Sequence, residues 1–297
     1  MSLERTRGPG DAGSRSAGAR LEIGVLVSVG RHGVTERARR ADLDARALEL
    51  ALAQRSQRGV GEVDIAACHV GASSDETDAA LRDYLGMGLE RLSLLEARED
   101  VDALPVLLDH LRGNEAEGDK AAGPRLVLCG TRAEQGEGSG VLPFALAEAL
   151  GWTMVSGVAA IEALEPDEGG WQATVLQALP RGQRRRLRVA LPAVIAVDTA
   201  APMPRQSAFG PARRGHIDRR PAGGEARVDE AVTEWPLTAA KVRSKRLKIV
   251  TATSARDRFK AAAAKAQGGT GQVLTDVTPE QGAEAILALL REEGVLR

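Results

Sequence analysis

Short apolar runs alternate with helix-like segments from Leu21 onward, and this alternation constrains the fold more than any other feature of the sequence. The first four runs, typical of buried strands, lie at residues 23–29, 63–68, 91–95 and 125–129. Strands that alternate with helices close into a parallel sheet that is covered on both faces. We therefore predict an α/β fold with a doubly wound, Rossmann-like, mostly parallel sheet.

The first helix is indicated by apolar residues at helical spacing. Leu43, Ala47, Leu50 and Ala51 share one stripe, and Gly59 lies just past the expected end. This stripe predicts a helix that packs one face against the sheet.

A second helix is predicted to begin at Ser73 and Glu76, which have the spacing of a capping box, and to run toward Leu85. In such a box each side chain bonds the backbone N–H of the other residue. A third helix is expected at about residues 101–111, followed by a solvated loop at 113–123.

The pattern changes in the second half of the chain. Apolar segments at residues 155–164, 171–179 and 187–198 are separated by turn sequences rich in Gly, Asp and Pro. Such spacing predicts antiparallel strands that extend the sheet. The nucleotide-binding domain is therefore expected to cover residues 21–198.

The two ends of the chain differ from this domain. Residues 1–20 are rich in Arg, Gly and Ser without an apolar core, which favours a disordered leader. Residues 216–297 have low apolar density and indicate an extended C-terminal arm. Its last helix has Thr278 as N-cap, Pro279 in the first position and Gln281 to complete a capping box. The apolar face of that helix consists of Ile286, Leu289 and Leu290.

Composition excludes several classes of function. Forty basic residues balance 41 acidic ones, and 2% of residues are aromatic, so binding to nucleic acid is not expected. No apolar run approaches the roughly 20 residues that cross a bilayer, so no membrane insertion is expected. Cys68 and Cys129 each end an apolar run, which favours strands in a reducing cytoplasm over a disulfide. The four histidines are scattered, so no metal site or catalytic triad is predicted.

Three segments in order along the chain carry a family resemblance. They are residues 42–49, residues 128–152, and residues 191–198 followed by Pro204, Arg205 and Phe209. Together they resemble the β subunit of the electron-transfer flavoproteins, as a divergent bacterial-type member, over residues 21–215. The resemblance implies an adenine nucleotide α-hydrolase-like fold and an electron carrier without catalytic residues of its own.

The resemblance also implies partners and cofactors. An α subunit would hold FAD mainly by itself, and this chain would add a structural AMP. Electrons would come from a flavin-dependent dehydrogenase and leave through electron-transfer flavoprotein:quinone oxidoreductase toward the respiratory chain. The location would be the bacterial cytoplasm, or an organellar matrix in a eukaryote. Residues 216–297 would pack on the α subunit.

The AMP site is expected at the carboxyl ends of the first and fourth strands, where a doubly wound sheet binds ligands. A glycine-rich turn there precedes a helix at residues 142–150, whose free N–H groups suit a phosphate. The alternative is a solvated turn that needs glycine only for its shape. The residues that match the family's AMP contacts are Ser28, Cys68, Gly130, Thr131, Gln135, Gly136, Glu137, Gly138, Ser139, Gly140 and Val141.

This sequence departs from the family pattern at several of these positions. Gln135 replaces a usual Asp, and Ser139 and Gly140 stand where the family typically has Thr or Asn-Gln. Outside this set, Ala41 and Asp42 replace an Asn-Pro pair. Near the flavin the resemblance places His32 and Leu43. The loop that holds His32 is short and lacks the aromatic residue that the family offers to FAD, so His32 either replaces that contact or is simply solvated.

The resemblance assigns residues 199–215 to partner recognition. Within this segment it points to Pro204, Arg205, Phe209, Arg213 and Arg214. Phe209 would insert into a pocket on the dehydrogenase, and the alternative is that it folds back onto its own domain.

A basic hairpin tip at residues 181–186 is expected to be solvated, with docking as the alternative. Two rival functions also remain. One is a stand-alone adenine-nucleotide enzyme or sensor of the same fold. The other is a bifurcating subunit with a second FAD in place of AMP.

Overall fold

The computed structural model describes residues 20–56, 63–116, 125–136, 138–167, 170–223, 227–230, 234, 236, 238 and 274–292. The predictions for the leader, for Gly59 and for Glu137 therefore fall outside the described residues, apart from Arg20. The chain divides into two compact units, Met1–Pro236 and Leu237–Arg297.

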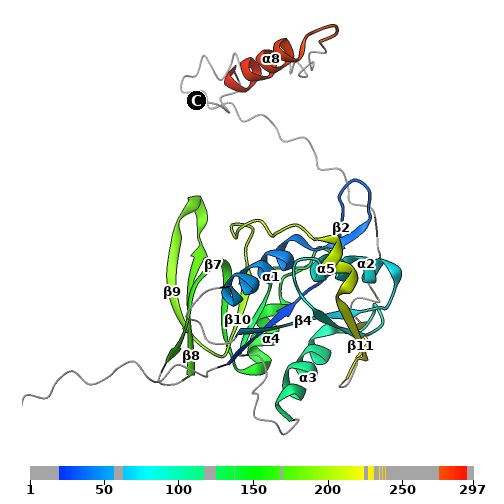
Figure 1. The fold of residues 1–297 in the computed structure, drawn as a ribbon, viewed down its shortest axis with the longest axis vertical. Coiled ribbons are helices and arrows are strands. Elements are labelled where there is room, and N and C mark those ends of the chain that lie inside the picture. The colour runs from blue at the N-terminus through cyan, green and yellow to red at the C-terminus, as the bar shows by residue number, and fades with distance from the viewer. Residues whose placement is uncertain are drawn as a thin grey trace, which may run out of the picture. The chain divides into compact units, whose positions relative to one another are not determined.

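The first unit is built on a nine-stranded sheet in the order β11-β5-β4-β1-β6-β10-β7-β8-β9 (Figure 1). The strands from β11 to β7 are parallel, and β8 and β9 continue the sheet in antiparallel fashion. This confirms the mostly parallel α/β sheet with an antiparallel extension. The strands are β1 (Leu21–Leu26), β4 (Val63–Gly71), β5 (Arg91–Glu96), β6 (Leu126–Gly130), β7 (Thr153–Asp167), β8 (Gly170–Ala178), β9 (Arg184–Ala190), β10 (Ala193–Val197) and β11 (His216–Pro221).

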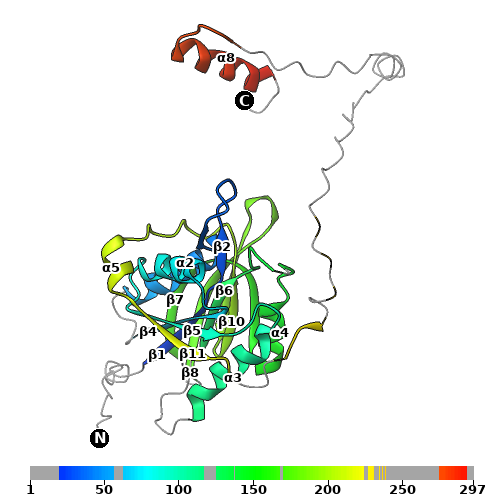
Figure 2. The ribbon, with the colours of Figure 1, turned by 90° about the vertical axis from the view of Figure 1, so that its right-hand side faces the viewer.

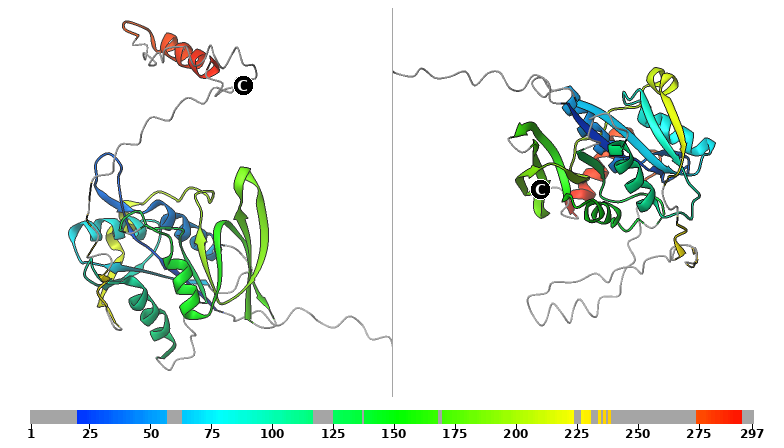
Figure 3. Two further views of the ribbon diagram at one scale, coloured as in Figure 1. Left: turned by 180° about the vertical axis from the view of Figure 1, so that it is seen from behind. Right: turned by 90° about the horizontal axis from the view of Figure 1, so that it is seen from below.

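Helices cover both faces of the parallel strands (Figure 2). One core contains buried residues of α1 (Asp42–Arg55) and α2 (Asp75–Leu85), and a second contains buried residues of α3 (Ala103–Ala116) and α4 (Leu142–Leu150). A short helix, α5 (Phe209–Arg214), lies beside α2. β7 and the two strands of the antiparallel extension, β8 and β9, stand at one end of the sheet (Figure 3, left).

The first strand is shorter than predicted. β1 ends at Leu26, and the chain then forms a separate hairpin of β2 (Val29–Arg31) and β3 (Ala38–Arg40). Because β2 pairs with β3 instead of continuing along β4, the short first loop is a two-stranded ribbon.

Two predictions about helix ends are wrong. The hydroxyl of Ser74, not Ser73, caps α2 by accepting a hydrogen bond from the N–H of Thr77 at 3.1 Å. Glu76 does not complete a box but pairs with Arg31. α3 continues to Ala116, so the first residues of the predicted loop are helical, and residues 117–123 of that prediction lie outside the described residues.

The expected strand over residues 187–198 is two strands. Leu191 N donates to Trp171 O in β8, whereas Ala193 N donates to Arg125 O beside β6. The chain therefore changes partners at the cis Leu191–Pro192 bond, and β10 enters the middle of the sheet between β6 and β7.

The domain also extends past the predicted boundary at Asp198. β11 adds to the edge of the sheet by pairing in parallel with β5. Only Ile217 of its six residues is buried, so the apolar pattern did not reveal it. The predicted arm therefore begins as part of the sheet.

The second unit contributes one described helix, α8 (Pro279–Glu292). Thr278 N donates to Gln281 Oε1 at 3.0 Å, and Gln281 N donates to Thr278 Oγ1 at 3.3 Å, which confirms the predicted capping box. Across the described residues of both units, no helix combines the length and apolarity that crossing a membrane requires.

Candidate functional site

The carboxyl ends of β1 and β6 are neighbours at the point where the order of strand addition reverses, since β4 lies on one side of β1 and β6 on the other. One carboxylate from α1 joins these two ends. Asp44 Oδ2 accepts from Ser28 N at 2.8 Å and from Ser28 Oγ at 2.5 Å, and Asp44 Oδ1 accepts from Gly130 N at 2.8 Å. Ser28 and Gly130, both predicted site residues, are thus brought together by a residue that the prediction omitted.

Burial dominates the electrostatics of Asp44. It raises the pKa of this carboxyl to about 6, although the hydrogen bonds from Ser28 and Gly130 act in the opposite direction. The fit is also tight, because a Cβ atom at Gly130 would lie 2.6 Å from both Asp44 Oδ1 and Leu43 Cβ. A glycine is required where the strand end approaches the helix.

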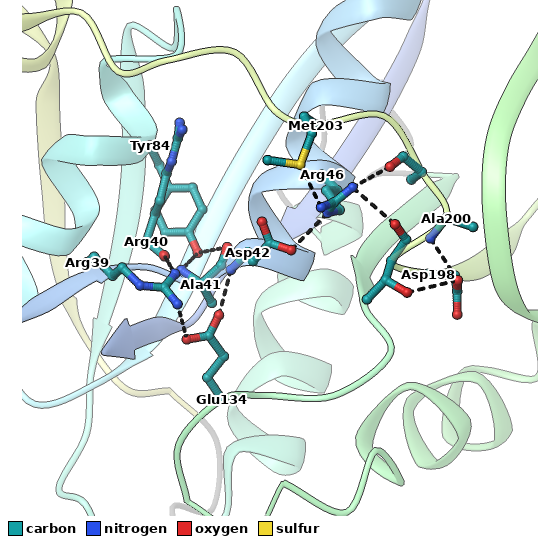
Figure 4. A network of polar contacts seen from close by, with 12 residues as sticks. Arg39, Arg40, Ala41, Asp42, Arg46, Tyr84, Glu134, Asp198, Ala200 and Met203 are labelled. Atoms are coloured by element: carbon teal, nitrogen blue, oxygen red, sulfur yellow. Dashed lines mark hydrogen bonds and ion pairs between the residues drawn. The ribbon is translucent and has the colours of Figure 1, made fainter. Parts of the chain in front are cut away.

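Tyr84 ties the same region to α2 (Figure 4). Its hydroxyl accepts from Ala41 N at 2.8 Å and donates to Ser28 O at 2.8 Å. Burial raises the pKa of Tyr84 well above its ordinary value, so the hydroxyl keeps its proton and serves as a donor.

The N-terminus of α1 is occupied by a carboxylate of the chain itself. Glu134 Oε1 accepts from Asp42 N at 2.7 Å, and Glu134 Oε2 accepts from Arg39 at 2.9 Å (Figure 4). Glu134 belongs to the glycine loop, which we define as residues 130–141. Because a helix N-terminus attracts negative charge, Glu134 already fills the place that an anion would take there.

The N-terminus of α4, at the other end of the glycine loop, has no such occupant. No side chain among the described residues caps it, although Ser139 Oγ accepts from Val141 N at 3.3 Å. Gly136, Gly138 and Gly140 all have positive φ, which suits a loop that exposes its N–H groups.

Two polar groups near this loop lack partners within the described part of the chain. Gln135 Nε2 and Arg40 Nη1 are both buried and unbonded there. Buried donors are normally satisfied, so these atoms fit a site that a polar ligand completes. Thr131, by contrast, uses its backbone N–H to bond Val197 O.

Other predicted residues lie apart from this arrangement. The thiol of Cys68 is buried in the core beneath α3 and α4, and burial raises its pKa to about 12. His32 is exposed in the β2–β3 turn, where its Nδ1 accepts from the N–H groups of Val34 and Thr35. Leu43 is buried against the end of β6.

The recognition loop, residues 199–215, is fastened to the domain along its length. The guanidinium of Arg205 forms two bonds to the Glu49 carboxylate, at 2.8 and 2.9 Å, and further on Ala208 N donates to Gly86 O. Phe209 nevertheless remains 80% exposed, with Arg213 and Arg214 exposed after it. The loop is held while its aromatic residue faces outward, so Phe209 does not fold back onto the domain.

The predicted basic hairpin tip lies at the β8–β9 turn. Part of its charge is used within the sheet, since Arg186 bonds Glu162 and Arg185 bonds Gln177. Among the described residues, no group of three His, Cys, Asp or Glu side chains gathers as a metal site would require.

The sequence prediction missed four residues that shape the site: Asp44, Arg46, Glu49 and Tyr84. A signal was available for the three in α1, because the charged residues Asp44, Arg46 and Glu49 lie close to the apolar stripe of this helix. Buried charges in a helix usually have specific partners, so their presence there indicates long-range contacts.

Comparison with known proteins agrees with this geometry. Residues 29–223 match the electron transfer flavoprotein domain. The chain is 56% identical over 277 residues to a protein of Chromohalobacter salexigens described as electron transfer flavoprotein subunit beta, covering 93% of this chain and 96% of that protein.

Proposed function

Because this chain belongs to the electron transfer flavoprotein family, we propose that it is the β subunit of a heterodimeric electron carrier. The observation that carries the proposal is the 56% identity to a β subunit across nearly the whole of both chains. An α subunit is then the partner, and together the two chains enclose FAD. The role is that of a carrier without catalytic residues of its own.

The glycine loop is the place where we propose that AMP binds. The uncapped N-terminus of α4 offers backbone N–H groups to a phosphate, whereas Glu134 already occupies the N-terminus of α1. The unbonded Nε2 of Gln135, a residue of the loop itself, supplies a further donor. The residues of this chain therefore fit an anionic nucleotide at α4 better than at α1.

FAD would supply the one-electron chemistry, and this chain would form part of the wall around it. His32 and Leu43 are the residues that we propose lie nearest to the flavin. His32 is accessible in its hairpin turn, while Leu43 contributes from the first turn of α1, behind the end of β6.

The recognition loop is proposed to dock on a flavin-dependent dehydrogenase. Phe209 is an exposed aromatic side chain on a loop that is fastened on either side of it, and exposed anchors of this kind often dominate binding energy. Arg213 and Arg214 would favour an acidic rim around the partner's pocket. Electrons would leave through electron-transfer flavoprotein:quinone oxidoreductase toward the respiratory chain, in the cytoplasm.

The C-terminal arm is proposed to pack on the α subunit. α8 exposes Ile286, Leu287 and Leu289, which a protein surface would cover. Replacing Ile286 and Leu289 with Glu should weaken heterodimer formation, whereas Glu284→Gln on the same helix should not. Equal heterodimer recovery by size-exclusion chromatography for both variants would contradict this role of α8.

The decisive experiment is to purify this chain together with its α subunit and to count the nucleotides released on denaturation. One FAD and one AMP per heterodimer support the proposal. Two FAD and no AMP would instead indicate the bifurcating type. A chain that stays monomeric in the presence of the α subunit and hydrolyses ATP would replace the carrier with a stand-alone enzyme.

A further inference from the structure

Arg46 is a charged residue buried beneath the recognition loop, and it has no role in the AMP or flavin sites described above. It lies in α1 with 8% of its surface exposed. Its guanidinium Nε donates to Asp42 Oδ2 at 2.9 Å, which leaves the other two nitrogens to face the loop (Figure 4).

Those two nitrogens bond the first part of the recognition loop at three points. Nη1 donates to Thr199 O at 3.1 Å and also to Ala201 O, and Nη2 contacts Met203 Sδ at 2.9 Å. Residues 202–208 have no regular secondary structure and no strand partner. Arg46 therefore does for residues 199–201, which lie just before this stretch, what a neighbouring strand does elsewhere, by satisfying alternate carbonyl groups.

The contact with Met203 has a further consequence. Its sulfur is held by Arg46, yet the side chain is 74% exposed. An apolar side chain displayed in this way offers a partner a surface whose conformation is already ordered, which reduces the entropy that binding must remove. Arg suits this task because its planar group directs several donors at once, whereas Lys offers a single ammonium centre.

We propose that Arg46 is a positioning residue for partner docking. The surface that it positions includes Met203, which is a second apolar contact for the dehydrogenase in addition to Phe209. This inference rests on the proposed docking role of the recognition loop. Glu49 holds the next part of the loop through Arg205, so α1 holds the recognition loop from Thr199 to Arg205.

The test uses the complete heterodimer with bound FAD and a dehydrogenase that reduces it. Arg46→Met keeps the apolar stem and removes the donors, Arg46→Lys keeps the charge, and Met203→Ala removes the displayed side chain. Arg55→Met is the matched control, because Arg55 lies in the same helix and donates to Gly88 O, which is not part of the recognition loop.

For Arg46→Met we expect the KM for the dehydrogenase to rise about tenfold with little change in kcat, because a pre-ordered contact is lost. FAD content and reduction by dithionite should stay unchanged. Backbone amides of Ala200, Ala201 and Met203 should exchange hydrogen faster. Arg46→Lys should give a KM and exchange rates between those of the wild type and those of Arg46→Met. Met203→Ala should raise KM without faster exchange at Ala200 and Ala201.

A merely structural role predicts a different result, namely a lower melting temperature with an unchanged KM, and that result would overturn the inference. If Arg46→Met yields no heterodimer, Arg46→Lys and Met203→Ala decide, and a normal KM for both overturns it. Phe209→Ala distinguishes a failure of this inference from a failure of the proposed docking role. If it raises KM while the Arg46 and Met203 variants do not, only this inference fails, whereas a normal KM for Phe209→Ala removes the docking role itself.

Discussion

The two loops that carry the proposed binding functions are held in opposite ways. The recognition loop is fastened by side chains of α1 and α2. Arg46 and Arg82 bond its backbone, and Glu49 bonds its Arg205. The glycine loop relies more on backbone geometry, with three glycines at positive φ, and two bonds link it to α1, one through Glu134 and one from Gly130 to Asp44.

This difference matches what each loop would bind. A preformed surface loses little entropy when a protein docks on it, so fastening the recognition loop favours association. A nucleotide brings its own hydrogen-bonding groups, so a loop with unbonded donors such as Gln135 Nε2 suits a ligand that completes it. Five predictions test the comparison.

The largest effect is expected at Asp44, where the glycine loop begins. The pKa of Asp44 is raised to about 6 in the folded chain, so the folded state binds the proton more tightly than the unfolded state does. Stability from this group therefore falls as pH rises from about 4 to about 6, by on the order of 3 kcal/mol. Asp44→Asn should lack this dependence. The measurement is the unfolding free energy of both proteins from pH 4 to pH 7; a difference that does not change with pH would contradict the prediction.

Gly130→Ala should destabilise the protein by about 2 to 3 kcal/mol, because the new Cβ would overlap Asp44 and Leu43. Gly33→Ala is the control, since nothing lies within 4 Å of a Cβ there. Thermal unfolding of the two variants is the comparison. Equal melting temperatures would mean that the glycine loop is loosely packed at its first residue, Gly130.

Phe209→Ala should weaken docking by about 2 kcal/mol, or about thirtyfold in affinity, because an exposed anchor is truncated. Stability should hardly change, since the side chain is 80% exposed. Dehydrogenase-coupled flavin reduction and thermal unfolding on the same variant check this. Lost stability with normal reduction would show that Phe209 supports its own domain and would remove its docking role.

Gly138→Val should lower nucleotide content and cost about 1 to 2 kcal/mol, because a side chain disfavours the positive φ of 61° at this position. Gly33→Val, at a glycine without positive φ, serves as control. Nucleotide released per heterodimer is the readout. Normal AMP content would place the phosphate elsewhere.

The smallest effect is expected for Glu49→Gln, which weakens the pair with Arg205. Because Arg205 is partly exposed, the pair should contribute about 0.5 to 1 kcal/mol. A small rise in the KM for the dehydrogenase is expected. Glu76→Gln, at the surface pair with Arg31, should leave KM unchanged. Equal KM values for the two variants would show that Glu49 does not help to hold the recognition loop.

The order of strands and helices was predictable because it depends on residues that are close together in the sequence. The apolar runs before residue 130 became β1, β4, β5 and β6, although β1 is shorter than expected. α4 covers residues 142–150, and Thr278 with Gln281 caps α8, as the sequence indicated. Each of these features involves residues a few positions apart, so local spacing contains the information.

The features that only the tertiary structure decided involve residues far apart in the chain. Asp44 meets Gly130 across 86 positions, and Arg46 reaches Ala201 across 155. β11 joins the sheet with one buried residue, because backbone pairing with β5, not side-chain burial, holds it. Sequence spacing alone determined the alternating fold and its caps. Which buried charge meets which backbone N–H or carbonyl depends on how the elements pack, and no local pattern records that.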